Sequence, residues 1–341
     1  MKDIVTSLQD HNGQAIITAT TFMVLTTIAV ALRFLTALTT KAKFNWSEVS
    51  LLAAYGCFIA QYVAEMYGLL EGRQMKSLMD PRLGTYLKAI YIGGEFYFPL
   101  ILFTNLSILL LYRRLFPVQE FKRWTNIFII AHVVWFIPSL VAETLMCSPP
   151  SIFWEQPLLI PEKCFMYSDY FISVMTIELA LDVAILILPL FYISKLHLSW
   201  ARRAELMFIF LLGGLVLISG IVRIVVSTEV GVQAIEFVQD IIWINIHSGV
   251  AIICACLPTY RPLIVKANSI LSNGMSKVFS SGAKSSLGAS GGESSRNTGG
   301  KSSKSVDGTI GSPRYKKYNK FGSVDEVQLV GMDVSSAKGA V

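Results

Sequence analysis

Seven long apolar segments, separated by short polar loops, constrain the fold of this chain more than any other feature. A helix needs about 20 mostly apolar residues to cross a bilayer. The backbone of such a segment must hydrogen-bond within itself, and the sequence lacks the ten-residue alternating pattern of a membrane β-barrel. We therefore predict an all-α polytopic membrane protein with seven transmembrane helices. The predicted spans are residues 15–35, 49–70, 88–112, 124–147, 170–193, 204–227 and 234–257.

Charged residues are few and unevenly distributed. Only 15% of the 341 residues are charged, whereas a soluble domain carries about 25%. Residues 261–341 are rich in Ser and Gly and hold twelve Lys or Arg against five acids. Such a composition cannot bury enough apolar surface to fold. We predict an extracellular N-terminus (1–14), a membrane domain (15–260) and a disordered, basic cytoplasmic tail (261–341).

Loop charges predict the orientation, because Lys and Arg favour the cytoplasmic side of a membrane. With the N-terminus outside, the inner loops hold ten Lys or Arg and the outer segments hold six. The expected C-terminus is therefore cytoplasmic, and the expected location is the plasma membrane. Arg113 and Arg114 then mark the inner end of the third span. They either anchor it near anionic headgroups or dock a partner.

Ionisable residues lie within the predicted spans. Such groups are costly and usually face the bundle interior or a wet cavity. At 1.5 Å per residue, most of them lie about 5–12 Å to the outer side of the midplane, and Asp182 lies near the middle. One arginine cannot neutralise all of these acids, so we predict an acidic, aromatic pocket that suits a cation or an amine. The candidate binding residues are Glu65, Glu95, Glu143, Glu178, Asp182, Arg223, Asp240 and Trp243.

Six motifs, in order along the chain, resemble those of the fungal rhodopsin-domain family. They are FNWSEVSLLAA, NLSILLLYRRLF, the loop with Cys147, Pro149, Trp154 and Cys164, LDVAILILPL, GIVRI and AIICACLPTYRPL. The chain departs from the family at Asn105, where Lys is frequent, and at His247, where Glu is frequent. The resemblance covers about residues 15–265 and implies a seven-helix, receptor-like protein. We expect a small extracellular ligand, and a cytoplasmic signalling partner at the inner loops and tail.

Other interpretations of the intramembrane acids stay open. They could be structural, with Arg223 paired to Asp240 or alternatively to Glu178. Glu178 and Asp182 also share one helix face, because they are four residues apart, and paired carboxylates can carry protons. The alternative function is therefore a proton- or cation-coupled transporter.

The sequence offers no motif for catalysis. It has no His-Glu-x-x-His, no Cys-x-x-Cys and no glycine-rich phosphate loop, so we predict neither an enzyme nor a nucleic-acid partner. Residues 234–260 contain no lysine. A retinal Schiff base would need one in the seventh helix, so we expect no covalently bound retinal and no other cofactor.

Two cysteines flank the loop between the fourth and fifth spans. The predicted orientation places Cys147 and Cys164 in an oxidising compartment, where disulfides form and persist. We predict a disulfide between them.

Overall fold

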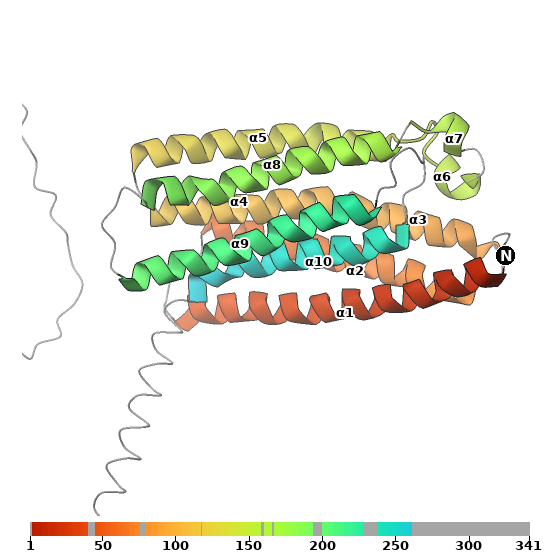
Figure 1. Ribbon diagram of the computed structural model, residues 1–341, viewed down its shortest axis with the longest axis horizontal. Coiled ribbons are helices and arrows are strands. Elements are labelled where there is room, and N and C mark those ends of the chain that lie inside the picture. Colours follow the sequence, from red (N-terminus) through yellow and green to blue (C-terminus); the bar gives the residue numbers. More distant parts are fainter. Residues whose placement is uncertain are drawn as a thin grey trace, which may run out of the picture. The chain divides into compact units, whose positions relative to one another are not determined.

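The described part of the chain is built from helices (Figure 1). The computed structural model describes residues 2–39, 45–75, 80–116, 118–157, 160–165, 167–193, 200–227 and 237–260. The helices are α1 (Lys2–Thr39), α2 (Trp46–Gln74), α3 (Arg82–Glu95), α4 (Tyr97–Leu115), α5 (Gln119–Thr144), α6 (Ile152–Glu155), α7 (Ile160–Lys163), α8 (Tyr167–Ile193), α9 (Trp200–Ser227) and α10 (Phe237–Cys256). A 3₁₀ turn, Leu257–Tyr260, follows α10. Within these ranges there is no strand, so the predicted all-α class is confirmed.

Six helical segments are long and apolar enough to cross a membrane. They are Asn12–Thr39, Trp46–Gln74, Arg82–Leu115, Gln119–Thr144, Ser168–Phe191 and Gln239–Tyr260. Each overlaps one of the predicted spans. α9 contributes a shorter apolar stretch, Gly213–Ser227, so the crossing predicted for residues 204–227 stays a prediction. The predicted N-terminal segment belongs to α1, which begins at Lys2, and the predicted tail, 261–341, lies outside the described residues.

α5 has an exposed apolar face and a buried face that contains polar residues. An exposed apolar stripe consists of Ile127, Ile130, Val134, Ile137 and Val141, each 50–63% exposed. These residues are three or four positions apart and so lie on one face of the helix. The buried face of the same helix contains His132, Ser139 and Glu143. A helix that is apolar outside and polar inside fits a hydrocarbon environment, because membrane proteins turn ionisable groups toward the bundle interior.

The third span is interrupted at Phe96. α3 ends at Glu95, and α4 begins one residue after the interruption. Pro99 has no N–H to donate to the Glu95 carbonyl, which removes one hydrogen bond from the helix. The Phe96 N–H donates to the carbonyl of Gly93, three residues back, at 3.2 Å, so the turn before the break is tighter than in an α-helix. The span predicted for residues 88–112 is thus one candidate crossing, Arg82–Leu115, built from two consecutive helices.

One end of the bundle is held by a buried arginine. Arg33 in α1 is 1% exposed. Its guanidinium donates to the Ala255 carbonyl at 2.7 Å and to Ser47 Oγ at 2.8 Å. The Glu48 carboxylate lies 3.7 Å away. The inner-side count of ten Lys or Arg includes Arg33, at the end of the first predicted span. Its side chain joins α1, α2 and α10 inside the bundle.

α2 and α3 approach closely at Gly68. A β-carbon placed on Gly68 would lie 2.9 Å from Ala89 Cβ and 3.3 Å from the Tyr86 carbonyl oxygen. Neither atom belongs to a flexible side-chain end, so α3 itself would have to shift. Gly56, on the same helix, has nothing within 4 Å of that position.

Replacing Gly68 with alanine should therefore destabilise the protein by about 1–3 kcal/mol, the usual cost of overpacking. Gly56→Ala is the matched control, and it should be neutral or stabilising, because alanine is a better helix former than glycine by about 1 kcal/mol. Thermal melting of both variants in one detergent measures the difference. Equal melting temperatures would show that the α2–α3 contact is not close.

Candidate functional site

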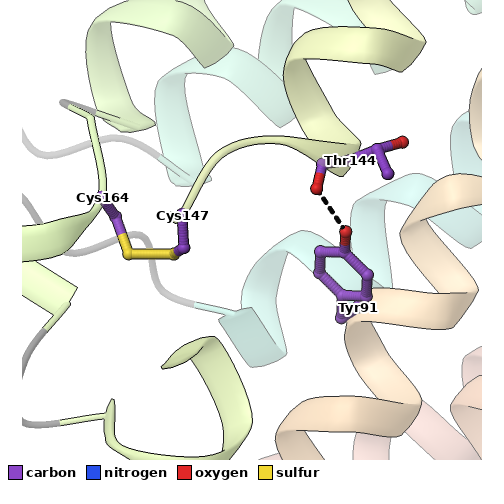
Figure 2. Close-up of a disulfide and its surroundings, with 4 residues drawn as sticks. All are labelled: Tyr91, Thr144, Cys147 and Cys164. Atoms are coloured by element: carbon purple, nitrogen blue, oxygen red, sulfur yellow. Dashed lines mark hydrogen bonds between the residues drawn. A yellow bond between two sulfur atoms is a disulfide. The ribbon is translucent and has the colours of Figure 1, made fainter. Parts of the chain in front are cut away.

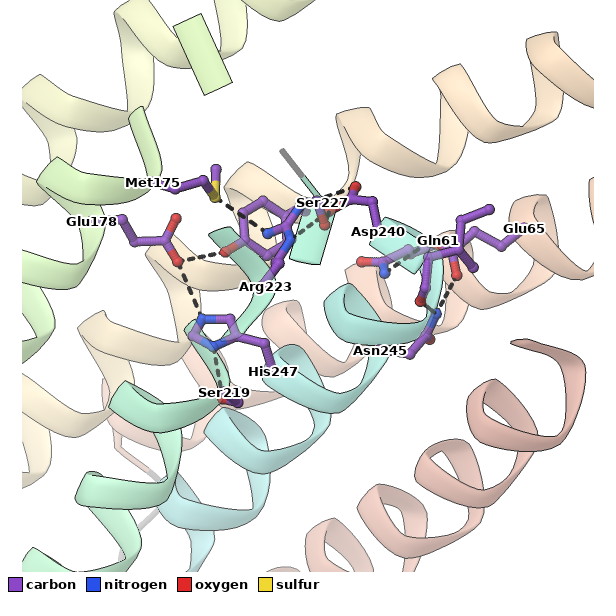
Figure 3. Close-up of polar contacts among 12 residues, drawn as sticks. Gln61, Glu65, Met175, Glu178, Ser219, Arg223, Ser227, Asp240, Asn245 and His247 are labelled. Atoms are coloured by element: carbon purple, nitrogen blue, oxygen red, sulfur yellow. Dashed lines mark hydrogen bonds and ion pairs between the residues drawn. The ribbon is translucent and has the colours of Figure 1, made fainter. Parts of the chain in front are cut away.

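A salt bridge joins α9 and α10 within a buried polar cluster (Figure 3). Arg223 Nε donates to Asp240 Oδ1 at 2.9 Å, and Nη2 donates to Oδ2 at 3.4 Å. Ser227 Oγ donates to the same carboxylate at 3.2 Å. A two-point contact of this kind adds geometric specificity to the charge pairing. The structure therefore pairs Arg223 with Asp240 rather than with the alternative partner, Glu178.

Aromatic rings and a thioether surround the rest of the Arg223 guanidinium. Its Cζ lies 4.3 Å from the centroid of the Tyr97 ring and 5.2 Å from that of Phe171. Nη1 contacts Met175 Sδ at 3.3 Å. Both ring distances are within the range of about 6 Å for cation–π attraction. The Arg223 guanidinium therefore has attractive contacts with the Asp240 carboxylate, two aromatic rings and the Met175 sulfur.

Glu178, in α8, is buried and only partly satisfied. Its Oε1 accepts a hydrogen bond from the Tyr97 hydroxyl and lies 3.3 Å from His247 Nε2. His247 Nδ1 lies 3.0 Å from Ser219 Oγ. Glu178 Oε2 is buried and has no hydrogen-bond partner among the described residues. Leaving such a buried acceptor unmatched costs about 1–3 kcal/mol, so a ligand that donates to Oε2 would gain stability there.

Asp182 lies one turn further along α8. Asn105 Nδ2 donates to its Oδ1 at 2.9 Å. Ligand atoms of Glu178, Asp182 and His247 all lie within 4.8 Å of one another. Carboxylate oxygens and imidazole nitrogens bind divalent metals such as Zn²⁺. These three residues could therefore hold a metal ion, an organic cation or a shared proton.

Two cavities adjoin the cluster, and Asp182 lines both. The smaller has a volume of about 10 Å³, which is room for about one water-sized group. It is lined by Tyr97, Met175, Glu178, Leu179, Asp182, Gly220, Arg223 and His247. The larger, of about 60 Å³, begins at Asn105 and Asp182 and continues along apolar side chains of α4, α8, α9 and α10. A few polar groups at one end of an apolar cavity are typical of small-molecule sites.

The other predicted candidates have different partners. The Glu65 carboxylate accepts hydrogen bonds from Gln61 Nε2 at 3.0 Å and from Asn245 Nδ2 at 2.6 Å. Glu95 Oε2 accepts one from the Thr144 hydroxyl at 3.1 Å. Neither acid lines the two cavities described above.

Glu143 and Trp243 also lie apart from the smaller cavity. Glu143 Oε1 lies 3.8 Å from the position of a β-carbon built on Gly94 of α3, and Trp243 is partly exposed on α10. Four of the eight predicted candidates therefore meet in the cluster: Glu178, Asp182, Arg223 and Asp240. The cluster also contains Tyr97, Asn105, Ser219 and His247, which were not among the predicted candidates. The sequence analysis did single out Asn105 and His247, as departures from the family pattern, and all four are polar side chains within apolar segments.

A disulfide closes the loop between α5 and α8. Cys147 and Cys164 are bonded, as predicted (Figure 2). The Ser148 N–H donates to the Lys163 carbonyl at 3.1 Å beside the bridge. The Tyr91 hydroxyl donates at 2.8 Å to the carbonyl of the last residue of α5. The disulfide and the backbone hydrogen bond thus join the two ends of the loop, and the Tyr91 contact connects α3 to the end of α5 where the loop begins.

The described residues have the architecture of a multi-pass membrane protein. Six helical segments are long and apolar enough to span a bilayer, and ionisable groups of α8, α9 and α10 pair inside the bundle. Residues 32–266 match the fungal rhodopsin domain. The chain belongs to this family.

Relatives of the chain include proteins of fungal biosynthesis clusters. The chain is 28% identical over 165 residues to satratoxin biosynthesis SC1 cluster protein 4 of Stachybotrys chartarum, which covers 48% of this chain and 60% of that protein. It is 26% identical over 273 residues to polyenoic acids biosynthesis gene cluster protein Ba17b of Metarhizium anisopliae (75% and 74%). It is 27% identical over 288 residues to fugralins biosynthesis cluster protein 2 of Gibberella zeae (80% and 71%). No solved structure matches the chain.

Proposed function

We propose that this chain is a receptor-like protein of the plasma membrane with seven crossings, an outer N-terminus and a cytoplasmic C-terminus. α9 would be the additional crossing. It has 28 residues, enough at 1.5 Å per residue to traverse a hydrocarbon core of about 30 Å. Its Ser219 and Arg223, one turn apart, meet His247 and Asp240 of α10. These two contacts support an antiparallel alignment of α9 with a helix that is itself a candidate span.

The ligand that this receptor senses would be a small molecule with a positively charged group, such as an amine. The observation that carries this proposal is Glu178 Oε2, a buried acceptor with no partner among the described residues. Glu178 and Asp182 share the smaller cavity with one guanidinium, which already pairs with Asp240. An ammonium group would donate to Oε2 and offset the remaining acids.

The larger cavity would receive the apolar part of such a ligand. It borders the same four helices as the cluster, α4, α8, α9 and α10, so a ligand there could favour one arrangement of the bundle over another. The relatives are named for the biosynthesis of satratoxin, polyenoic acids and fugralins, which is consistent with a small molecule as the ligand. The remaining predicted candidates stay predictions for an outer wall of the site: Glu65, Glu95, Glu143 and Trp243.

A thermal-stability screen of purified full-length protein against primary, tertiary and quaternary amines tests this site. A ligand present at about 100 times its Kd should add about 2.7 kcal/mol to the free energy of unfolding. Glu178→Gln should abolish that gain, because it removes the charge and keeps the shape. Glu65→Gln is the matched control, since Glu65 is a buried acid with its own amide partners. No stabilising amine, or equal stabilisation of Glu178→Gln and wild type, would refute the proposal.

Cation-coupled transport is the second candidate function. The observation that favours it is the convergence of Glu178, Asp182 and His247 ligand atoms within 4.8 Å. Measuring uptake of the amine into sealed proteoliposomes, driven by a proton or cation gradient, distinguishes a transporter from a receptor. Gradient-dependent accumulation of the amine that is lost in Asp182→Asn would support transport, whereas binding without accumulation would support the receptor.

The proposed orientation has its own test. Protease added to intact cells should leave a C-terminal tag uncleaved, because the tag would be cytoplasmic. The Asn45-Trp46-Ser47 sequon at the start of α2 should carry no glycan for the same reason. Glycosylation at Asn45, or cleavage of the tag in intact cells, would reverse the orientation.

A further inference from the structure

A basic cavity lies where three spans end, away from the buried cluster. It is lined by Asn45, Trp46, Ser47, Glu48, Leu110, Leu111, Arg113, Arg114 and Lys122. Its volume is about 280 Å³. The lining comes from the first turn of α2, the last two turns of α4 and the first turn of α5. Since these are the ends of candidate spans, the cavity lies at the level of the lipid headgroups.

The charges of this cavity favour an anion. Arg113, Arg114 and Lys122 have no carboxylate within salt-bridge distance in the described part of the chain. Arg113 Nη1 donates to a neutral group, Asn126 Oδ1, at 3.0 Å. The one acid in the lining, Glu48, lies 3.7 Å from the buried Arg33. Three positive charges therefore face the cavity, and its one negative charge is already compensated.

Two features point to a phosphorylated lipid rather than to a soluble anion. Trp46 is 77% exposed at the edge of the cavity, and tryptophan is favoured at the headgroup level of a bilayer. The cavity also opens between helix ends, where the acyl chains of a lipid can stay in the membrane. Guanidinium groups bind phosphate with two parallel hydrogen bonds, which selects phosphate over a diffuse negative surface.

We propose that this cavity, formed by α2, α4 and α5, binds the phosphorylated headgroup of an anionic lipid such as a phosphoinositide. Trp46 packs at the headgroup level, while Arg113, Arg114 and Lys122 contact the phosphates. Each cation near a membrane surface contributes enough attraction to change lipid affinity about fivefold. The proposal is independent of the ligand at Glu178.

Titration of full-length protein with a bisphosphorylated phosphoinositide, followed by native mass spectrometry, tests the proposal. Lys122→Gln should weaken binding about fivefold. The triple variant Arg113→Gln/Arg114→Gln/Lys122→Gln should reduce bound lipid to the level of phosphatidylcholine. Arg123→Gln is the matched control, because Arg123 carries the same charge at the same end of α5 and does not line the cavity. Arg123→Gln should bind like wild type.

Several outcomes would overturn the proposal. Equal weakening by Arg123→Gln and Lys122→Gln would mean that only diffuse charge attracts the lipid. Equal binding of phosphatidylserine and the phosphoinositide would show that the cavity does not select the phosphate groups on the inositol ring. Binding of soluble inositol trisphosphate as tight as that of the lipid would assign the cavity to a soluble anion. Melting of all variants in phosphatidylcholine nanodiscs confirms that they remain folded, and Lys122→Gln alone decides the outcome if the triple variant does not fold.

Discussion

Replacing Arg223 with alanine should lower the free energy of unfolding by about 3–5 kcal/mol, the usual cost of breaking a buried ion pair. The substitution leaves the Asp240 carboxylate without its cation and removes the guanidinium from the faces of Tyr97 and Phe171. Loss of expression or a large fall in melting temperature in detergent would be the measured effect. An Arg223→Ala protein as stable as wild type would contradict the salt bridge.

A double-mutant cycle separates the ion pair from the packing. Arg223→Gln and Asp240→Asn remove one charge each with little change of shape. If the two residues pair, the double variant should be less destabilised than the sum of the single variants, because neither charge is left alone. The matched cycle with Glu178→Gln should show a smaller coupling, since Glu178 bonds to Tyr97 and His247 instead. A larger coupling with Glu178 would reassign the partner.

Removing the Cys147–Cys164 disulfide should cost about 3 kcal/mol in the chain-entropy model, because the bridge closes a loop with a sequence separation of 17 residues. The double variant Cys147→Ser/Cys164→Ser avoids leaving a reactive thiol. It should melt well below wild type, and reducing agent should lower the wild-type melting temperature. Cys57→Ser, a free cysteine in α2, is the control. Equal melting of the double variant and wild type would contradict a structural bridge.

Hydropathy predicted the six candidate spans, because a bilayer imposes one length and one composition on every crossing. The crossing at residues 204–227 stays a prediction. The break at Phe96 shows where that signal ends. The flanking segments are apolar, and the features that mark the break are Gly93, Gly94 and the missing N–H of Pro99. The beginning of α1 at Lys2 shows the same limit. Hydropathy indicates which residues can lie in the hydrocarbon core of the bilayer. A helix can continue beyond those residues, as α1 does.

The candidate site was only partly predictable. Counting residues along a helix gives depth, so Arg223 and Asp240 could be matched as residues at similar depth on adjacent helices. Depth does not say which way a side chain points around the helix axis. Glu65 and Glu178 were both placed in the outer half, yet Glu65 bonds to Asn245 and Glu178 to His247. Those contacts depend on the rotation of each helix, which long-range packing decides.

An experimental structure of the protein with a stabilising amine tests the central claim most directly. We predict density for the ammonium group within hydrogen-bonding distance of Glu178 Oε2, with the apolar part of the ligand in the cavity between α4, α8, α9 and α10. The Arg223–Asp240 salt bridge should be unchanged. Density for the amine at Glu65, Glu95 or Glu143, with the smaller cavity unchanged, would contradict the account.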